Sequence, residues 1–178
     1  MQVNNKTLYI YKRLDNFKNM LTLHLIRHAK TEVSTESDSD KDRQLTQKGI
    51  EQAVRLGKHI EQEGVSLGLI LCSTAQRTKE TMFHLLANTN NDIPPKLLDS
   101  LYLASAKDIL IEIDQIKKRA TTLTVIGHNE GISELASVLA DKYIQLHPCE
   151  MVTLTFDFDE WYMLIPGSGF VHFHANLE

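Results

Sequence analysis

The sequence predicts an α/β protein, a three-layer α/β/α sandwich whose central sheet is mostly parallel and carries antiparallel strands at its C-terminal edge. Short apolar runs alternate with stretches whose apolar residues recur at helical spacing. Strands that alternate with helices in this way form a parallel sheet covered on both faces. Near the C-terminus two β-rich runs follow one another without a helix between them, which predicts an antiparallel pair.

The N-terminal half supplies two predicted strands and two predicted helices. Residues 21–26, LTLHLI, form an apolar run of strand length, and residues 31–44 are polar and acidic, which predicts a solvated loop. Thr46 then has the chemistry of a helix N-cap, and apolar residues follow it at helical spacing. The run GLILCS (68–73) predicts a buried strand, and residues 75–86 predict a helix.

The C-terminal half continues the alternation and then ends it. A short strand is expected over residues 96–98, after two prolines, and residues 105–108 resemble a capping box that begins the next helix. Residues 122–128 predict a strand and residues 131–140 a helix. The antiparallel pair is expected within MVTLTFDF (151–158) and WYMLIPG (161–167).

Composition limits the possible functions. At 178 residues, with 42% hydrophobic and 24% charged side chains, residues 21–178 are expected to form one globular domain, preceded by an N-terminal extension over residues 1–20. A net charge of −4 argues against nucleic-acid binding, and no apolar stretch approaches the roughly 20 residues that span a membrane. Cys72 and Cys149 lack metal-ligand spacing, and the first residues lack the apolar core of a signal peptide. A cytoplasmic location is therefore expected.

Side chains suited to phosphate follow three of the predicted strands. Arg27 and His28 follow the first strand, and Arg77 lies about one turn into the helix after the second. His128 ends the fourth strand, directly after Gly127. Because ligands of such sheets bind beyond the carboxyl ends of the strands, we expect these side chains to share one rim.

The chemistry of these side chains suits phosphoryl transfer. The planar fork of an arginine donates two parallel hydrogen bonds, so two arginines can hold all three equatorial oxygens of a phosphoryl group. A histidine that is neutral near pH 7 offers a ring nitrogen as a nucleophile toward phosphorus. A second histidine, expected to be protonated, would donate to the same oxygens. Positioning and charge dominate such reactions.

Three segments resemble the signature motifs of the histidine phosphatase superfamily, in its phosphoglycerate-mutase-like branch. They are LIRHAKTE (25–32), LCSTAQRTKETM (71–82) and VIGHNEGISELA (125–136). The stretch DRQLTQKGIEQA (42–53) and the short chain resemble most closely the SixA-type phosphohistidine phosphatases of that superfamily. An RH pair with a later GH is a weak signal alone, but three segments in order, each at a strand end, form a specific one. The resemblance covers about residues 21–173.

The resemblance implies a metal-independent phosphatase that uses no cofactor and acts on a phosphorylated protein or small molecule. It assigns the phosphorylated nucleophile to His28 and the second histidine to His128. The phosphate-clamping arginines are then Arg27 and Arg77. Two further residues lie near these four in the same segments and are expected to bind substrate: Thr31 and Asn129.

The sequence departs from many members of this superfamily at the general acid. Those members place a Glu or Asp soon after the third strand, whereas Tyr102 or Leu103 stands there in this chain, and neither Asp99 nor Asp108 fits the pattern. SixA-type members resemble this sequence in lacking that carboxylate. Losing a general acid costs about 10²- to 10⁴-fold in rate, but the imidazole of a phosphohistidine leaves as a neutral molecule once its ring carries a proton. We therefore expect phosphohistidine on a protein as the substrate.

Other functions stay open on the sequence alone. The alternative substrate is a phosphomonoester with a good leaving group, and the alternative to an enzyme is a module that binds phosphorylated partners. A metal-dependent hydrolase would use this rim with Asp42 or Glu130, and His172 with His174 could bind a metal, although they lack Cys or carboxylate partners. The acidic loop 32–42 is interpreted as solvated; the other interpretation is that it flanks the site and repels highly anionic substrates.

Overall fold

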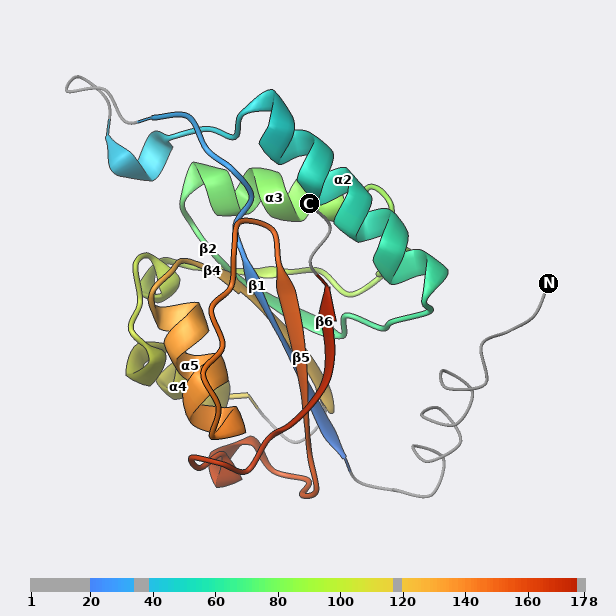
Figure 1. The fold of residues 1–178 in the computed structure, drawn as a ribbon, viewed down its shortest axis with the longest axis vertical. Coiled ribbons are helices and arrows are strands. Elements are labelled where there is room, and N and C mark those ends of the chain that lie inside the picture. Colours follow the sequence, from blue (N-terminus) through green and yellow to red (C-terminus); the bar gives the residue numbers. More distant parts are fainter. Residues whose placement is uncertain (1–19, 34–38, 117–119, 176–178) are drawn as a thin grey trace.

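Six strands form one sheet, seen in a computed structural model together with the helices that cover it (Figure 1). The structure describes residues 20–33, 39–116 and 120–175, so residues 1–19 of the predicted extension lie outside the described part. The strands are β1 (Leu21–Arg27), β2 (Leu69–Ser73), β3 (Lys96–Leu98), β4 (Thr122–Gly127), β5 (Met151–Phe156) and β6 (Phe170–Ala175). The helices are α2 (Gln47–Gln62), α3 (Gln76–Leu86), α4 (Ala106–Asp114) and α5 (Gly131–Ala140).

The strand order β3-β2-β4-β1-β5-β6 confirms the predicted sheet. β1 pairs in parallel with β4, β4 with β2, and β2 with β3. β5 runs antiparallel to β1, and β6 runs antiparallel to β5. The carboxyl ends of β1, β2 and β4 therefore meet at one edge of the sheet, where the sequence places its phosphate-binding side chains.

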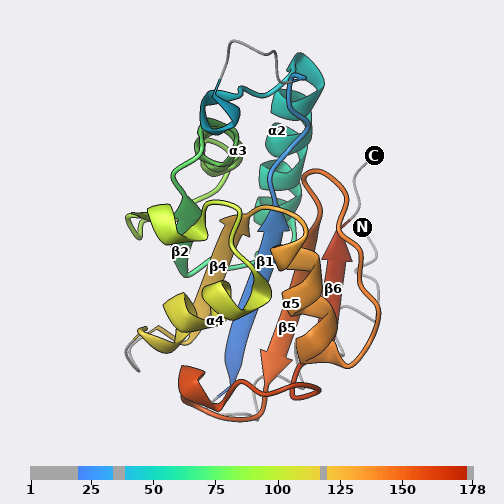
Figure 2. The same ribbon diagram turned by 90° about the vertical axis from the view of Figure 1, so that its left-hand side faces the viewer.

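Helices cover both faces of the sheet, which confirms the three-layer prediction (Figures 1 and 2). α2 and α3 lie against one face, and α4 and α5 lie against the other. Side chains alternate between the two faces of a strand. On β1, Leu25 accordingly packs in the core beneath α4 and α5, whereas its neighbour Ile26 packs in the core beneath α2 and α3.

Side-chain caps fix the starts of two helices as the sequence predicts. At α2, Thr46 Oγ1 accepts a hydrogen bond from the backbone N–H of Gly49 at 3.0 Å. At α4, Ser105 Oγ accepts from the backbone N–H of Asp108, and the Asp108 carboxylate accepts from the backbone N–H of Ser105. This reciprocal capping box satisfies donors that the helix itself leaves unpaired.

The segment WYMLIPG (161–167) is not the second antiparallel strand, so this prediction was wrong. Its first three residues form a 3-10 turn, and the strand that pairs with β5 is β6. Trp161 is 2% exposed, and its indole N–H donates to the backbone oxygen of Ala120 at 2.7 Å. The large apolar residue therefore anchors a turn to the core beneath α4, where β-rich composition alone suggests a strand.

His24 makes the fold sensitive to acid. This β1 residue is 1% exposed; its Nε2–H donates to the backbone oxygen of Ser66 at 3.0 Å, and its Nδ1 accepts from the Thr153 hydroxyl at 2.8 Å. Burial lowers the pKa of His24 from 6.5 to about 4. The unfolded chain thus binds the proton more tightly, so the contribution of His24 to stability is present above pH 6.5 and is lost as the pH falls toward 4.

We therefore expect His24 alone to lower the free energy of unfolding by up to about 3 kcal/mol between pH 7 and pH 4. Urea denaturation at several pH values measures this change. The variant His24→Gln should show a shallower pH dependence than the wild type. His84→Gln, which alters a histidine on α3, should keep the wild-type dependence. Equal pH dependence of His24→Gln and the wild type would contradict the assignment.

Candidate active site

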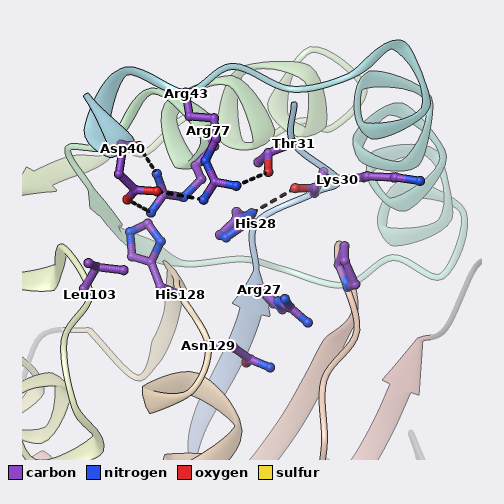
Figure 3. A pocket seen from close by; sticks show the side chains of 12 residues that line it. Arg27, His28, Lys30, Thr31, Asp40, Arg43, Arg77, Leu103, His128 and Asn129 are labelled. Carbon is purple, nitrogen blue, oxygen red and sulfur yellow. Dashed lines mark hydrogen bonds and ion pairs between the residues drawn. The ribbon is translucent and has the colours of Figure 1, made fainter. Parts of the chain in front are cut away.

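One pocket of about 410 Å³ lies beyond the carboxyl ends of β1, β2 and β4 (Figure 3). Arg27 ends β1, and His28 follows it. Arg77 lies in the first turn of α3, after β2, and His128 follows β4. The structure brings all six predicted site residues together here: Arg27, His28, Thr31, Arg77, His128 and Asn129.

The His28 ring is held in one tautomer. Its Nδ1–H donates to the backbone oxygen of Ala29 at 2.8 Å, and because a carbonyl oxygen only accepts, the lone pair of the neutral ring lies on Nε2. Burial, together with the charges of Arg77 and Arg27, lowers the pKa of His28 to about 4. Near pH 7 the ring is therefore neutral, which is the form that can attack phosphorus.

His128 lies next to His28, with 5.3 Å between the ring centroids. Its Nε2 is 2.9 Å from Ser73 Oγ, and the ring is 2% exposed. Burial and then the charge of Arg77 lower the pKa of His128 to about 3. The expectation of a protonated second histidine is therefore wrong for the free protein, because a cation is unfavourable in a buried position beside an arginine. A neutral imidazole still donates one N–H.

The two predicted arginines are held in different ways. Arg77 is 1% exposed; its Nη1 donates to the backbone oxygen of Asp40 at 2.5 Å and its Nη2 to Asp40 Oδ2 at 3.0 Å. Arg27 is half-buried, and its Nη1 donates to the backbone oxygen of Leu146 at 3.0 Å. Burial lowers the pKa of Arg27, and the nearby charge of Glu150 opposes that effect. Both guanidinium groups are thus oriented from the pocket wall.

Several buried polar atoms of the pocket have no hydrogen-bond partner within the part of the chain that the structure describes. They are the Nε atoms of Arg27, Arg43 and Arg77, and Nδ1 of His128. Buried polar atoms are paired in nearly all folded proteins. A cluster of unpaired guanidinium donors therefore indicates an anionic ligand with several acceptor oxygens, and a phosphoryl group has that chemistry.

Thr31 and Asn129 line the pocket but are bonded to other protein groups. Thr31 Oγ1 accepts from Arg43 Nη1 at 2.9 Å. The Asn129 amide donates from Nδ2 to the backbone oxygen of Leu146 at 3.0 Å, and its Oδ1 accepts from Ser133 Oγ at 2.8 Å. In this arrangement Thr31 orients an arginine, and Asn129 joins the start of α5 to the loop before β5.

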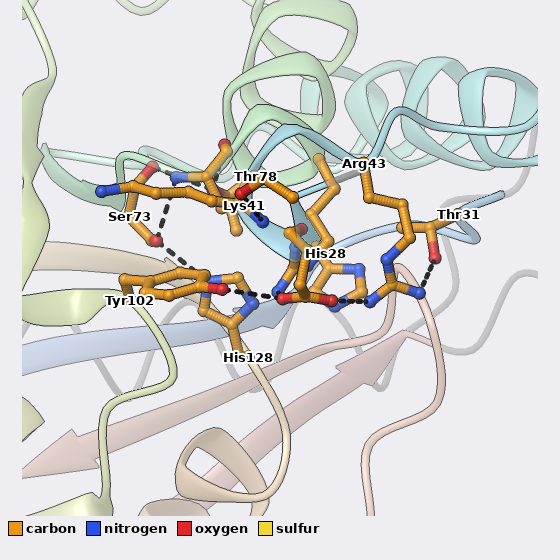
Figure 4. A network of polar contacts seen from close by, with 12 residues as sticks. His28, Thr31, Lys41, Arg43, Ser73, Thr78, Tyr102 and His128 are labelled. Atoms are coloured by element: carbon orange, nitrogen blue, oxygen red, sulfur yellow. Dashed lines mark hydrogen bonds and ion pairs between the residues drawn. The ribbon is translucent and has the colours of Figure 1, made fainter. Parts of the chain in front are cut away.

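The acidic loop places Asp40 in the pocket, which our interpretation of it as a solvated loop did not predict (Figure 3). Figure 4 shows the surrounding network of polar contacts, with Tyr102 and Arg43 labelled. Asp40 begins a 3-10 turn, and its carboxylate accepts hydrogen bonds from three side chains. Arg77 Nη2 and the Tyr102 hydroxyl donate to Oδ2, the latter at 2.8 Å, and Arg43 Nη2 donates to Oδ1 at 2.9 Å. The sequence signal for this turn is the pair of opposite charges three residues apart, shortly before the N-cap Thr46.

Asp40 is ionised. Partial burial favours its neutral form, but the hydrogen bond from Tyr102 and the charges of the two arginines prevail and lower the pKa of Asp40. The two other carboxylates considered for the general acid, Asp99 and Asp108, are not among the described residues that line the pocket. Asp99 accepts a hydrogen bond from Thr74 at 2.6 Å, and Asp108 caps α4. Among the described residues that line the pocket, Asp40 carries the one carboxylate, so no carboxylic acid there is ready to protonate a leaving group.

The structure also bears on metal and membrane binding. Within residues 20–33, 39–116 and 120–175, no group of three or more His, Cys, Asp or Glu side chains is arranged to hold a metal ion. Asp42 and Glu130, named above for a metal-dependent hydrolase, are not among the described residues that line the pocket. No helix in these ranges has the length and apolar character to cross a membrane.

Sequence comparisons connect the chain with one family. Residues 23–102 match the model of the histidine phosphatase superfamily (branch 1). An uncharacterized protein of Mycobacterium tuberculosis is 36% identical over 115 residues, which cover 65% of this chain and 70% of that protein. An uncharacterized chloroplastic protein of Arabidopsis thaliana is 31% identical over 158 residues, covering 83% of this chain and 72% of that protein.

Solved structures share the fold. A protein assigned as phosphohistidine phosphatase SixA from Nakamurella multipartitia superposes with a TM-score of 0.73 at 24% identity, covering 90% of this chain and 98% of its own. The protein histidine phosphatase SixA complexed with tungstate superposes with a TM-score of 0.73 at 15% identity, covering 86% of this chain and 96% of its own. A phosphoserine phosphatase from Entamoeba histolytica superposes with a TM-score of 0.59 at 16% identity, covering 89% of this chain and 98% of its own.

Proposed function

Because the chain is a phosphatase that belongs to the histidine phosphatase superfamily (branch 1), we propose that it hydrolyses its substrate through a covalent phosphoryl group on His28, without a metal. His28 Nε2 attacks phosphorus, the bond to the leaving group breaks, and the bonding pair departs with that group. Arg27, Arg77 and His128 donate to the equatorial oxygens. Water then attacks the phosphorus of phospho-His28 and releases phosphate.

One observation carries this proposal: unpaired buried guanidinium donors surround a histidine whose lone pair lies on Nε2. Donors that are oriented before the substrate arrives stabilise the negative charge of the transferring group without reorganisation, which is the largest single contribution in many enzymes. The Arg77 guanidinium is anchored by Asp40 at the pocket wall and the His28 ring by a backbone carbonyl. The site is thus organised for nucleophile and anion together.

For the substrate we propose phosphohistidine on a protein. The pocket carboxylate, Asp40, is ionised, so it cannot donate the proton that a poor leaving group requires from a general acid. A phosphorylated imidazole avoids this requirement. The likeness in fold to structures named SixA supports the same choice. A phosphomonoester with a good leaving group is the second candidate, because it too departs without a proton.

The proposal is tested by measuring phosphate release from three peptides, which carry phosphohistidine, phosphoserine or phosphotyrosine. All three assays contain excess chelator. We expect kcat/KM for the phosphohistidine peptide to exceed that for the phosphoserine peptide by about 100-fold or more, the range that an absent general acid costs. Equal rates on all three peptides would contradict the substrate proposal. Activity that the chelator removes would contradict the metal-independent mechanism. No release from any peptide would favour a small-molecule substrate or a phosphate-binding module.

A further inference from the structure

We infer that Asp40 is a specificity-determining residue that selects the leaving group: its carboxylate favours a departing group that presents an N–H or a positive charge over an oxygen leaving group that departs with a negative charge. The inference rests on the proposed function and adds a residue to it, because none of the family motifs quoted above includes Asp40. It is based on the position of the Asp40 carboxylate, which lies in the same pocket as the guanidinium groups of Arg77 and Arg43.

The position of Asp40 brings it beside any phosphoryl group that Arg77 holds. The two residues already share a hydrogen bond of 3.0 Å between Arg77 Nη2 and Asp40 Oδ2. Figure 3 shows Asp40 above His128, reaching into the pocket from the 3-10 turn. Its side chain is 41% exposed, so it faces the open side of the pocket, from which a peptide or small molecule enters.

The donors around Asp40 keep the carboxylate in its charged form. Tyr102 and Arg77 bond to Oδ2, and Arg43 bonds to Oδ1. Charge-assisted hydrogen bonds of this kind stabilise the anion. Asp40 can therefore accept a hydrogen bond from a substrate or attract a cation, but it has no proton to give.

This difference separates two classes of substrate. In a phosphohistidine whose second ring nitrogen is protonated, the new bond forms between phosphorus and His28 Nε2 while the P–N bond breaks. The bonding pair stays on the departing nitrogen, and the ring leaves as neutral imidazole with its N–H on the other nitrogen. A carboxylate that accepts from this N–H stabilises the protonated ring before and during departure. An oxygen leaving group offers no such donor, and its negative charge is repelled by Asp40.

A purely structural role for Asp40 makes a different prediction. If the carboxylate only anchors Arg77 and Arg43, its loss disturbs phosphoryl binding for every substrate alike. Activity on a phosphohistidine peptide and on p-nitrophenyl phosphate would then fall by the same factor. The ratio of the two kcat/KM values separates selection of the leaving group from anchoring.

The experiment compares Asp40→Asn with Asp42→Asn, which removes the same charge from an exposed position two residues along the turn and outside the pocket lining. For Asp40→Asn we expect the ratio of phosphohistidine to p-nitrophenyl phosphate kcat/KM to fall by about tenfold or more, the usual cost of losing a hydrogen bond to a charged group. Asp42→Asn should keep the wild-type ratio. An unchanged ratio in Asp40→Asn, or an equal fall in both variants, would overturn the inference.

The wild-type protein separates this inference from the proposed function. If the wild type prefers the phosphohistidine peptide and Asp40→Asn keeps that preference, the proposed substrate stands and the role of Asp40 is wrong. If the wild type shows no preference for phosphohistidine over p-nitrophenyl phosphate, the proposed substrate is wrong and the role of Asp40 is overturned with it.

Discussion

Replacing His28 by alanine is expected to lower kcat/KM for a phosphorylated peptide by at least about 10⁴-fold, since a covalent nucleophile is lost. His128 cannot take its place, because its Nε2 is bonded to Ser73 and its position is set by the loop after β4. Binding of orthophosphate should survive, because the guanidinium donors do not depend on the His28 ring. Initial rates and titration calorimetry with orthophosphate measure the two effects.

A matched control for this variant is His84→Ala, which removes an imidazole from the last turn of α3, outside the pocket lining. It should keep wild-type rates. Substantial turnover by His28→Ala, with a rate within about tenfold of the wild type, would show that another group attacks phosphorus. Loss of both turnover and orthophosphate binding, together with an altered near-ultraviolet circular dichroism spectrum, would show damage to the fold and not to the chemistry.

Arg77→Lys is expected to lower kcat/KM by about 10²- to 10³-fold, the usual result of removing one preorganised donor to a developing negative charge. Lysine keeps the positive charge but offers a single point of contact in place of the planar fork. Because Arg77 is 1% exposed, water has little access to replace the lost hydrogen bonds. The Ki of orthophosphate should rise less than kcat falls, since the transition state carries the charge that the fork recognises best.

Arg55→Lys provides the control for Arg77→Lys, because Arg55 is exposed on α2 and lies outside the pocket lining. That variant should be indistinguishable from the wild type in rate and in Ki. If Arg77→Lys also retains wild-type kcat/KM, the bidentate contact assigned to Arg77 is absent from the transition state. Steady-state kinetics with orthophosphate as the competing ligand distinguish these results.

The parts of the site that follow strands could be predicted from the sequence. Arg27, His28 and His128 each stand at the carboxyl end of an apolar run, and a parallel sheet brings such ends to one edge. Arg77 lies in the first turn of the helix after β2, so its place also follows from local periodicity. In each case a short-range pattern together with one rule of sheet topology fixes the position.

The parts that depend on long-range contacts could not be predicted. Asp40 enters the pocket because Arg77 and Tyr102, both distant in sequence, bind its carboxylate; the local sequence shows only an acidic loop. Trp161 lies in a turn because its indole N–H donates a hydrogen bond to the backbone oxygen of Ala120, although its neighbours have strand-forming composition. The neutral state of His128 likewise follows from burial and from a charge supplied by another element.

The central claim is that the phosphoryl group passes through His28, and rapid-quench mass spectrometry tests it most directly. The protein is mixed with a phosphohistidine peptide in chelator, quenched in alkali within the first turnover and digested. We predict the mass of one phosphoryl group on the peptide that contains His28, and no such adduct in His28→Ala. Turnover without any phosphorylated enzyme, or a phosphoryl group on a residue other than His28, would contradict the account.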